Sequence, residues 1–150
     1  MVQASASSPT LSERCFTALR YGNLTEFEAL ITEGADINAA NIYGETLLHV
    51  AVDLYRPVIV QLLLEAGAAV DIQTRTGDTP LWRAVNNARG RGEIIKRLID
   101  AGANPYRRNL KGASPIDVAR EAGNQGMQHL LIHADNHQPA TRAGSQSAHA

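Results

Sequence analysis

Three histidines near the carboxyl end have a spacing that could bind a metal ion. His129, His133 and His137 follow one another at intervals of four, so His129 and His133 would share one face of a helix. Two imidazoles can hold zinc, but a site also needs a third ligand and supporting hydrogen bonds. His137 lies beyond the expected end of that helix, and no cysteine or carboxylate is an obvious replacement. We therefore predict no metal site and no bound cofactor.

The single cysteine, Cys15, is the other candidate for chemistry. A reactive thiol needs exposure and a nearby positive charge. Cys15 instead holds a position that is apolar further along the chain, at Leu48 and Leu81, so it is expected to be a buried structural thiol. The sequence also lacks a glycine-rich phosphate loop, a HExxH zinc motif and a Gly-x-Ser-x-Gly elbow. These observations predict that the protein is not an enzyme.

An arginine-rich loop is the most unusual local feature. The segment 86–92 reads NNARGRG and includes Asn86, Asn87, Arg89 and Arg91. Arginine suits bidentate capture of carboxylates or phosphates, and insertions in repeats often lie on the binding face. A solvated connector is the alternative interpretation, because loops of this composition usually have that role.

These residues lie within a tandem repeat. Gly34 recurs as Gly67 and Gly102, at spacings of 33 and 35 residues. The same two spacings relate three further series of residues: Thr46, Thr79 and Ser114; Leu48, Leu81 and Ile116; and Ala51, Ala84 and Ala119. Several residue types that share one phase indicate repeated units, and a fixed period of this length is typical of a solenoid.

The repeated residues resemble the signature of ankyrin repeats. Residues 46–51 (TLLHVA) and 79–84 (TPLWRA) are similar to the Thr-Pro-Leu-His-x-Ala motif, and residues 114–119 (SPIDVA) resemble the form found in terminal repeats. Residues 34–38 (GADIN) and 102–105 (GANP) look like the turn that closes each unit. The resemblance covers about residues 11–134. It implies an all-α solenoid of helix-turn-helix units with projecting fingers.

The residues of one unit predict the same structure by themselves. Thr46 is placed to cap a short helix, and Pro80 stands at the first helical position of the next unit, where a missing N–H costs nothing. A second helix begins near Pro57 and ends at Gly67, which needs a positive φ. Each helix pair leaves an apolar face open, so the core forms only when units stack.

Four units are expected within one domain. The predicted boundaries are a flexible N-terminus at 1–9, repeats at about 10–40, 41–73, 74–108 and 109–134, and a disordered tail at 135–150. The resemblance implies that the ring of His49 bonds neighbouring turns. Trp82 takes the same position in the next unit, where it is expected to pack and its indole N–H to find a partner.

The resemblance also implies a concave surface, lined by fingers and first helices, that binds another protein. The corresponding positions of this chain are Ile42, Tyr43, Glu45, Asp53, Arg75, Asp78, Asn86, Asn87, Arg89, Arg91, Lys111 and Glu121. Tyr43 is the preferred anchor, because an exposed aromatic residue carries binding energy at small entropic cost. Packing of Tyr43 against the next finger is an equal alternative.

The composition fits a single globular domain. The chain has 150 residues, 44% of them apolar, and a formal net charge of −1. It contains no apolar run near the roughly 18 residues of a membrane span and no signal-peptide pattern. We expect a cytoplasmic monomer without a membrane partner. The small four-unit form resembles bacterial ankyrin proteins, so an inhibitor, immunity-type or adaptor role is expected by resemblance alone.

Charge is distributed unevenly along the chain. Residues 1–71 carry nine acidic and three basic residues, a sum of −6, whereas residues 72–150 carry six and eleven, a sum of +5. This difference could orient a partner, or it could be drift on two solvated faces. The competing function is therefore binding of an anionic ligand or nucleic acid by the arginine-rich second half. A net charge near zero and the lack of a basic stripe with interleaved aromatic residues weigh against it.

Overall fold

The computed structural model describes residues 7–87 and 92–133. Within these ranges the chain forms eight α-helices and no named strand, which confirms the predicted all-α repeat solenoid. The helices are α1 (Leu11–Tyr21), α2 (Leu24–Thr32), α3 (Leu47–Asp53), α4 (Pro57–Glu65), α5 (Pro80–Asn86), α6 (Gly92–Asp100), α7 (Pro115–Glu121) and α8 (Gln125–His133). None of these described helices is long and apolar enough to cross a membrane.

Some of the predictions fall outside the described residues. These are most of the predicted flexible N-terminus, the predicted disordered tail at 135–150, His137, and the loop residues Arg89 and Arg91.

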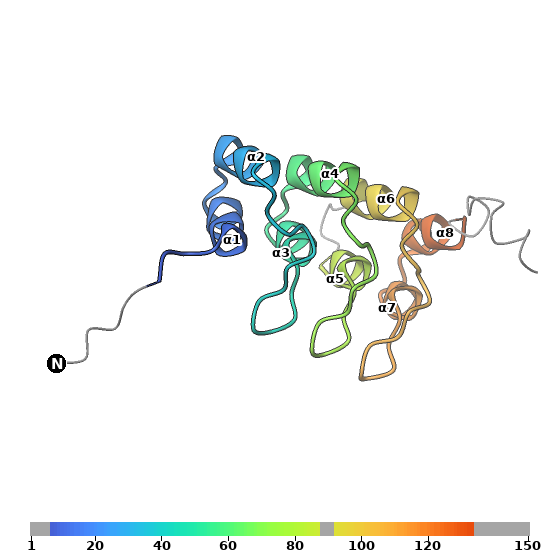
Figure 1. The fold of residues 1–150 in the computed structure, drawn as a ribbon. Helices are drawn as coiled ribbons and strands as arrows, with labels where there is room; N and C mark the ends of the chain where they lie inside the picture. Colours follow the sequence, from blue (N-terminus) through green and yellow to red (C-terminus); the bar gives the residue numbers. More distant parts are fainter. Residues whose placement is uncertain (1–6, 88–91, 134–150) are drawn as a thin grey trace, which may run out of the picture.

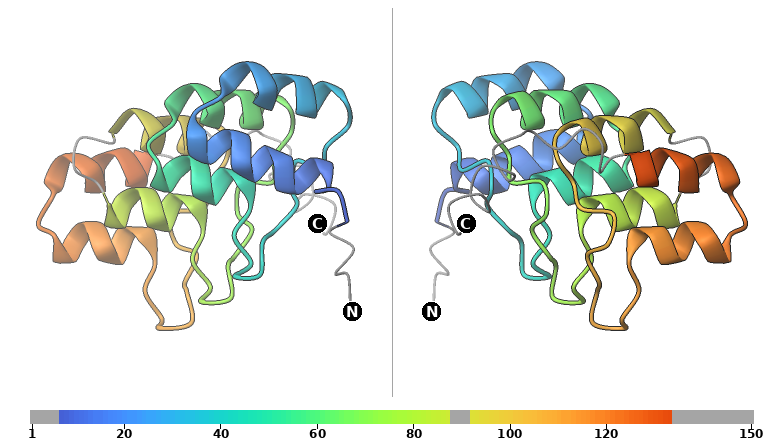
Figure 2. Two further views of the ribbon diagram at one scale, coloured as in Figure 1. Left: turned by 90° about the vertical axis from the view of Figure 1, so that its left-hand side faces the viewer. Right: turned by 90° about the vertical axis from the view of Figure 1, so that its right-hand side faces the viewer.

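The helices pack in two rows (Figure 1). Helices α1, α3, α5 and α7 form an inner row, in which each contacts the next, while α2, α4, α6 and α8 form an outer row, drawn above it in Figure 1. Three long turns project past the inner row on one side of the molecule (Figure 2). We call these turns the first, second and third fingers, which comprise residues 39–46, 72–79 and 107–114. The stacking of helix pairs thus places the fingers side by side.

The core repeats with the period of the sequence. On the inner helices, one buried column consists of Cys15, Leu48, Leu81 and Ile116, and a second consists of Ala18, Ala51, Ala84 and Ala119. On the outer helices, a fully buried column consists of Leu30, Leu63, Leu98 and Leu131. The small alanines allow neighbouring inner helices to approach closely, and the leucines fill the space between rows. Each column therefore continues from one unit into the next.

Local residues set the start of the inner helices. The Thr79 hydroxyl accepts a hydrogen bond from the backbone N–H of Trp82 at 3.1 Å, and Pro80 is the first residue of α5. Ser114 and Pro115 begin α7 in the same way. A capped N–H and a proline that has none leave fewer unpaired donors in the first turn. The Thr-Pro and Ser-Pro pairs therefore mark helix starts, as the sequence predicts.

Gly67 follows α4 with a φ of +88°, and its N–H donates to the carbonyl of Leu64 at 3.1 Å. A Cβ at this position would meet no atom within 4 Å, so a substitution tests backbone strain alone. We expect Gly67→Val to lower the free energy of unfolding by about 1 to 3 kcal/mol. The Asn variant should cost less, because asparagine tolerates a positive φ. Chemical denaturation measures both, and equal midpoints for the valine variant and the wild type would contradict the assignment of this turn.

Candidate functional site

The tips of the three fingers are joined by backbone hydrogen bonds. The N–H of Arg75 in the second finger donates to the carbonyl of Tyr43 in the first, at 3.0 Å. The N–H of Leu110 in the third finger donates to the carbonyl of Thr76 in the second, also at 3.0 Å. These bonds fix the spacing of the tips. We call the row formed by residues 42–43, 75–76 and 110–111 the finger edge.

Large apolar side chains are exposed at both ends of the finger edge. Ile42 is 71% exposed, Tyr43 61% and Leu110 79%. Between and beside them lie the exposed side chains of Arg75 and Lys111. The structure therefore brings together four of the predicted contact residues, Ile42, Tyr43, Arg75 and Lys111, along one rigid row. Leu110 adds a second apolar position at its far end.

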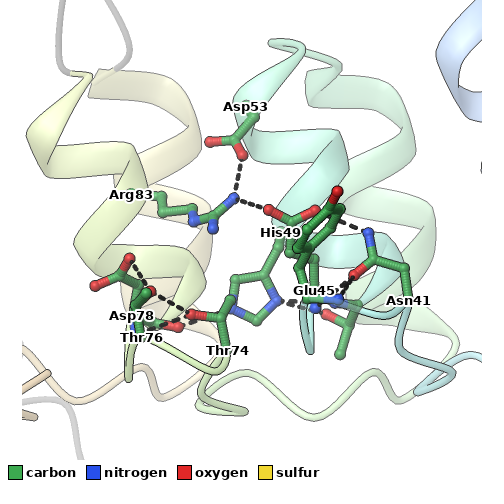
Figure 3. A network of polar contacts seen from close by, with 10 residues as sticks. Asn41, Glu45, His49, Asp53, Thr74, Thr76, Asp78 and Arg83 are labelled. Carbon is green, nitrogen blue, oxygen red and sulfur yellow. Dashed lines mark hydrogen bonds and ion pairs between the residues drawn. The ribbon is translucent and has the colours of Figure 1, made fainter. Parts of the chain in front are cut away.

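Two predicted contact residues, Glu45 and Asp53, are held together by an arginine of the next unit (Figure 3). Nη1 of Arg83 in α5 donates to Oε1 of Glu45 at 2.8 Å and to Oδ2 of Asp53. The side chains are only partly exposed, at 17% for Arg83, 22% for Glu45 and 32% for Asp53. We call these three residues the Arg83 cluster. It links the first finger and α3 to α5.

The Arg83 cluster favours the charged forms of Glu45 and Arg83. Burial of the Glu45 carboxylate disfavours its charged form, but hydrogen bonds from Asn41 and Arg83 outweigh this and lower the pKa of Glu45. Burial also opposes the charge of Arg83, yet the neighbouring Asp53 and Glu45 raise the pKa of its guanidinium. The two carboxylates are therefore compensated within the protein, which leaves them less available to an outside cation.

Asp78 is another predicted contact residue whose carboxylate is hydrogen-bonded within the protein. Its Oδ2 accepts a hydrogen bond from the Thr76 hydroxyl at 2.8 Å, and its Oδ1 accepts one from the Asn109 amide at 2.9 Å. Asn109 belongs to the third finger, so this bond joins neighbouring fingers. Asp78 thus contributes to the alignment of the finger edge.

The ring of His49 links α3 to the second finger, as the resemblance implies. The backbone N–H of Thr46 donates to its Nδ1 at 3.1 Å, and the carbonyl of Asp78 lies 3.0 Å from its Nε2. A backbone N–H can only donate, so Nδ1 must be unprotonated and Nε2 must carry the hydrogen. The residue is fully buried, and burial lowers the pKa of His49 from 6.5 to about 4. His49 is therefore a neutral structural link at neutral pH.

Trp82 does not reproduce that link, and the prediction that its indole N–H finds a partner is wrong. Nε1 of Trp82 is buried, and among the described residues it has no hydrogen-bond partner. Its position corresponds to that of His49, one period later. Indole has a single donor and no acceptor, so it cannot accept from the backbone N–H of Thr79 as the Nδ1 of His49 accepts from Thr46. Trp82 contributes packing without the polar link.

The other predicted contact residues that the structure describes lie at the far ends of two inner helices. Asn86 is the last residue of α5, Asn87 follows it, and Glu121 is the last residue of α7; all three are exposed. One seven-residue helix, about 10 Å long, separates these positions from the fingers. They border the inner row of helices and do not belong to the finger edge.

Sequence reasoning missed Arg83 as a site residue. Its equivalents in the two neighbouring units are Val50 and Val118, so a charged residue stands where both neighbours have an apolar one. That departure is the signal that could have identified it. Its partners lie 38 and 30 residues earlier in the sequence, and no local pattern indicates them.

The structure also describes Cys15, His129 and His133, the residues whose types could support catalysis or metal binding. Cys15 is buried in α1, and burial raises the pKa of its thiol, which disfavours the reactive thiolate. His129 and His133 lie on the exposed side of α8 with their Nε2 atoms 2.8 Å apart. Among the described residues, no three histidine, cysteine, aspartate or glutamate side chains form a group that could hold a metal ion.

The sequence of this chain matches one protein family and is similar to several known proteins. The chain matches the family model described as "Ankyrin repeats (3 copies)" over residues 15–109 and 57–142. It is 30% identical to a mitochondrial disaggregase of Bos taurus, over 81% of this chain and 23% of that protein. It is 34% identical to a putative ankyrin repeat protein of Acanthamoeba polyphaga mimivirus, over 74% of this chain and 73% of that protein.

A further relative is the NF-kappa-B inhibitor delta of Homo sapiens, 34% identical over 68% of this chain and 35% of that protein. The chain thus spans about a quarter of the disaggregase and about a third of the inhibitor.

Proposed function

Because this chain belongs to the ankyrin-repeat family, we propose that it is a non-catalytic module that binds a partner protein. The partner lies across the finger edge and the exposed ends of α5 and α7. Ankyrin repeats generally mediate interactions between proteins, which supports the general class. The choice of surface rests on the arrangement of the fingers in this chain.

The observation that carries the proposal is a rigid row with an exposed aromatic residue. Backbone hydrogen bonds at 3.0 Å join the tips, so little conformational entropy is lost when a partner docks. Tyr43 is 61% exposed and offers a large apolar ring with a polar hydroxyl. Side chains of this type often carry most of the binding energy of an interface.

The proposed contact residues form two groups. Ile42, Tyr43, Arg75 and Lys111 make the primary contacts at the finger edge. The remaining described positions border this surface: Glu45, Asp53, Asp78, Asn86, Asn87 and Glu121. Arg89 and Arg91 lie outside the described residues and stay proposed contacts from their place in the sequence alone. One relative is named as an inhibitor, so an inhibitor-type or adaptor role is the form of binding that we favour.

Tyr43→Ala should weaken binding of the natural partner by about 1 to 3 kcal/mol, or about 5- to 150-fold. The partner is first captured from cells with tagged protein and identified by mass spectrometry. Its affinity for the purified wild type and variants is then measured by calorimetry. Tyr21→Ala is the matched control, because Tyr21 is 85% exposed at the end of α1, away from the fingers.

Equal losses from both tyrosine variants, or a loss from Tyr21→Ala alone, would contradict the proposed surface. The competing function gives a different result. A nucleic-acid ligand should bind with a steep dependence on salt and should be insensitive to Tyr43→Ala.

A further inference from the structure

The three fingers carry an excess of exposed positive charge. Their cations are Arg75, Arg107, Arg108 and Lys111, and all four are exposed. Their carboxylates are Glu45 and Asp78, and both are partly buried. Four cations against two carboxylates leave a sum of +2 on a protein whose formal net charge is −1. The fingers thus differ in sign from the chain as a whole.

The carboxylates of Glu45 and Asp78 are already hydrogen-bonded within the protein, so they offset little of the positive charge on the fingers. Glu45 accepts hydrogen bonds from Asn41 and Arg83 at 2.8 Å each. Asp78 accepts from Thr76 and Asn109. A partner that approaches the fingers therefore meets little uncompensated negative charge.

The four cations differ in whether their side chains already have a partner within the protein. Arg107 donates to Gln73 at 3.2 Å, and Arg108 donates to the carbonyl of Gly112 and lies 3.5 Å from Asp117. The side chains of Arg75 and Lys111 form no hydrogen bond or ion pair with any described residue. Both stand at finger tips, whose backbones are fixed by hydrogen bonds. Arg75 and Lys111 are therefore the cations best placed for recognition.

We propose that the finger edge binds an acidic polypeptide segment that also contains apolar residues. This inference rests on the proposed function and adds the chemistry of the partner. Carboxylates of the segment pair with Arg75 and Lys111, and its apolar side chains pack on Tyr43 at one end and Leu110 at the other. Along the finger edge Tyr43 is followed by Arg75 and then by Leu110 with Lys111, and this order sets the order of the contacts along the segment.

The exposed residues favour a polypeptide over a nucleic acid. Single-stranded nucleic acids are held by aromatic side chains that stack on bases, combined with a continuous basic groove. Two of the three large apolar side chains at the finger edge, Ile42 and Leu110, are aliphatic and cannot stack in this way. Aliphatic contacts combined with isolated charges are typical of protein partners.

The test is a selection from a display library of random peptides of about 15 residues, long enough when extended to cross the three fingers. We expect the selected peptides to be enriched in aspartate and glutamate, with aromatic or aliphatic residues between them. Synthetic copies are then measured by fluorescence anisotropy. Arg75→Glu and Lys111→Glu should each weaken binding about tenfold or more, because each replaces an attraction with a repulsion.

Lys96→Glu is the matched control for Lys111→Glu. Lys96 lies on α6 of the outer row, 65% exposed, so the same charge change there should alter binding less than twofold, or about 0.4 kcal/mol. Circular dichroism checks that each variant keeps its helices. The expected affinity also falls as salt rises, since the contacts are exposed charges.

Five results would overturn the inference. Selected peptides that depend on Tyr43 but are not acidic, or that ignore both charge reversals, would refute the acidic partner and leave the proposed function intact. Peptides that bind without dependence on Tyr43 would refute the proposed function itself. An empty selection, or stronger competition by a single-stranded oligonucleotide than by acidic peptides, would also count against the inference.

Discussion

Replacing Gly77 with alanine should lower the free energy of unfolding by about 2 to 5 kcal/mol. Gly77 lies in the second finger with a φ of +82°, which residues with a side chain resist. A Cβ there would also lie 2.7 Å from the backbone nitrogen of Leu110 and 3.0 Å from Cα of Asn109. Both are backbone atoms of the third finger, so they cannot move aside without disturbing the hydrogen bond that joins the tips.

Gly112→Ala is the control for backbone strain. Gly112 holds the equivalent position in the third finger with a φ of +78°, but a Cβ there would meet nothing within 4 Å. It should cost only the strain of the positive φ, about 1 to 2 kcal/mol. Chemical denaturation compares the two variants. If they lost the same stability, the close approach of the second and third fingers would play no energetic part.

Acidification should destabilise the protein by up to about 3 kcal/mol through His49 alone. Burial lowers the pKa of His49 from 6.5 to about 4 in the folded state, where the ring faces Arg83, Glu45 and the carbonyl of Asp78. Between these pH values the unfolded chain binds a proton at this residue and the folded chain does not. The contribution of His49 is therefore complete above pH 6.5 and is lost as the pH falls towards 4, at about 1.4 kcal/mol per pH unit.

The geometry explains why the ring resists protonation. Nε2 already carries a hydrogen that donates to Asp78, so an added proton must go to Nδ1. There it would face the N–H of Thr46 and replace a hydrogen bond with a repulsion. The hydrogen bonds that link α3 to the second finger therefore require a neutral His49 ring.

The measurement is the free energy of unfolding against pH for the wild type and for His49→Gln. Glutamine can still accept from the backbone N–H of Thr46, as in a capping box, but it does not titrate. Carboxylates such as Glu45 titrate in both proteins, so the difference between the two curves reports His49. Parallel curves between pH 6.5 and pH 5 would show that His49 has no such role.

The sequence alone determined the architecture, because each unit encodes its own local structure. Thr79 with Pro80, and Ser114 with Pro115, begin helices through backbone hydrogen bonding and a fixed φ. Gly67 accepts a positive φ after a helix, as its residue type allows. The period of 33 to 35 residues repeats these signals and the buried columns, so the stacking of units follows from the pattern.

Only the tertiary structure decided which polar groups are paired. Glu45, Asp53 and Asp78 are indistinguishable in the sequence from free surface carboxylates, yet Arg83 holds the first two and Asn109 contacts the third. Trp82 has the register of His49 without its hydrogen bonds. Hydrogen bonds need their atoms placed about 3 Å apart, and between units this placement depends on how neighbouring helices and fingers pack. Residue types repeated at a fixed period set which units are neighbours, whereas the pairing of individual side chains depends on distances that no single unit encodes.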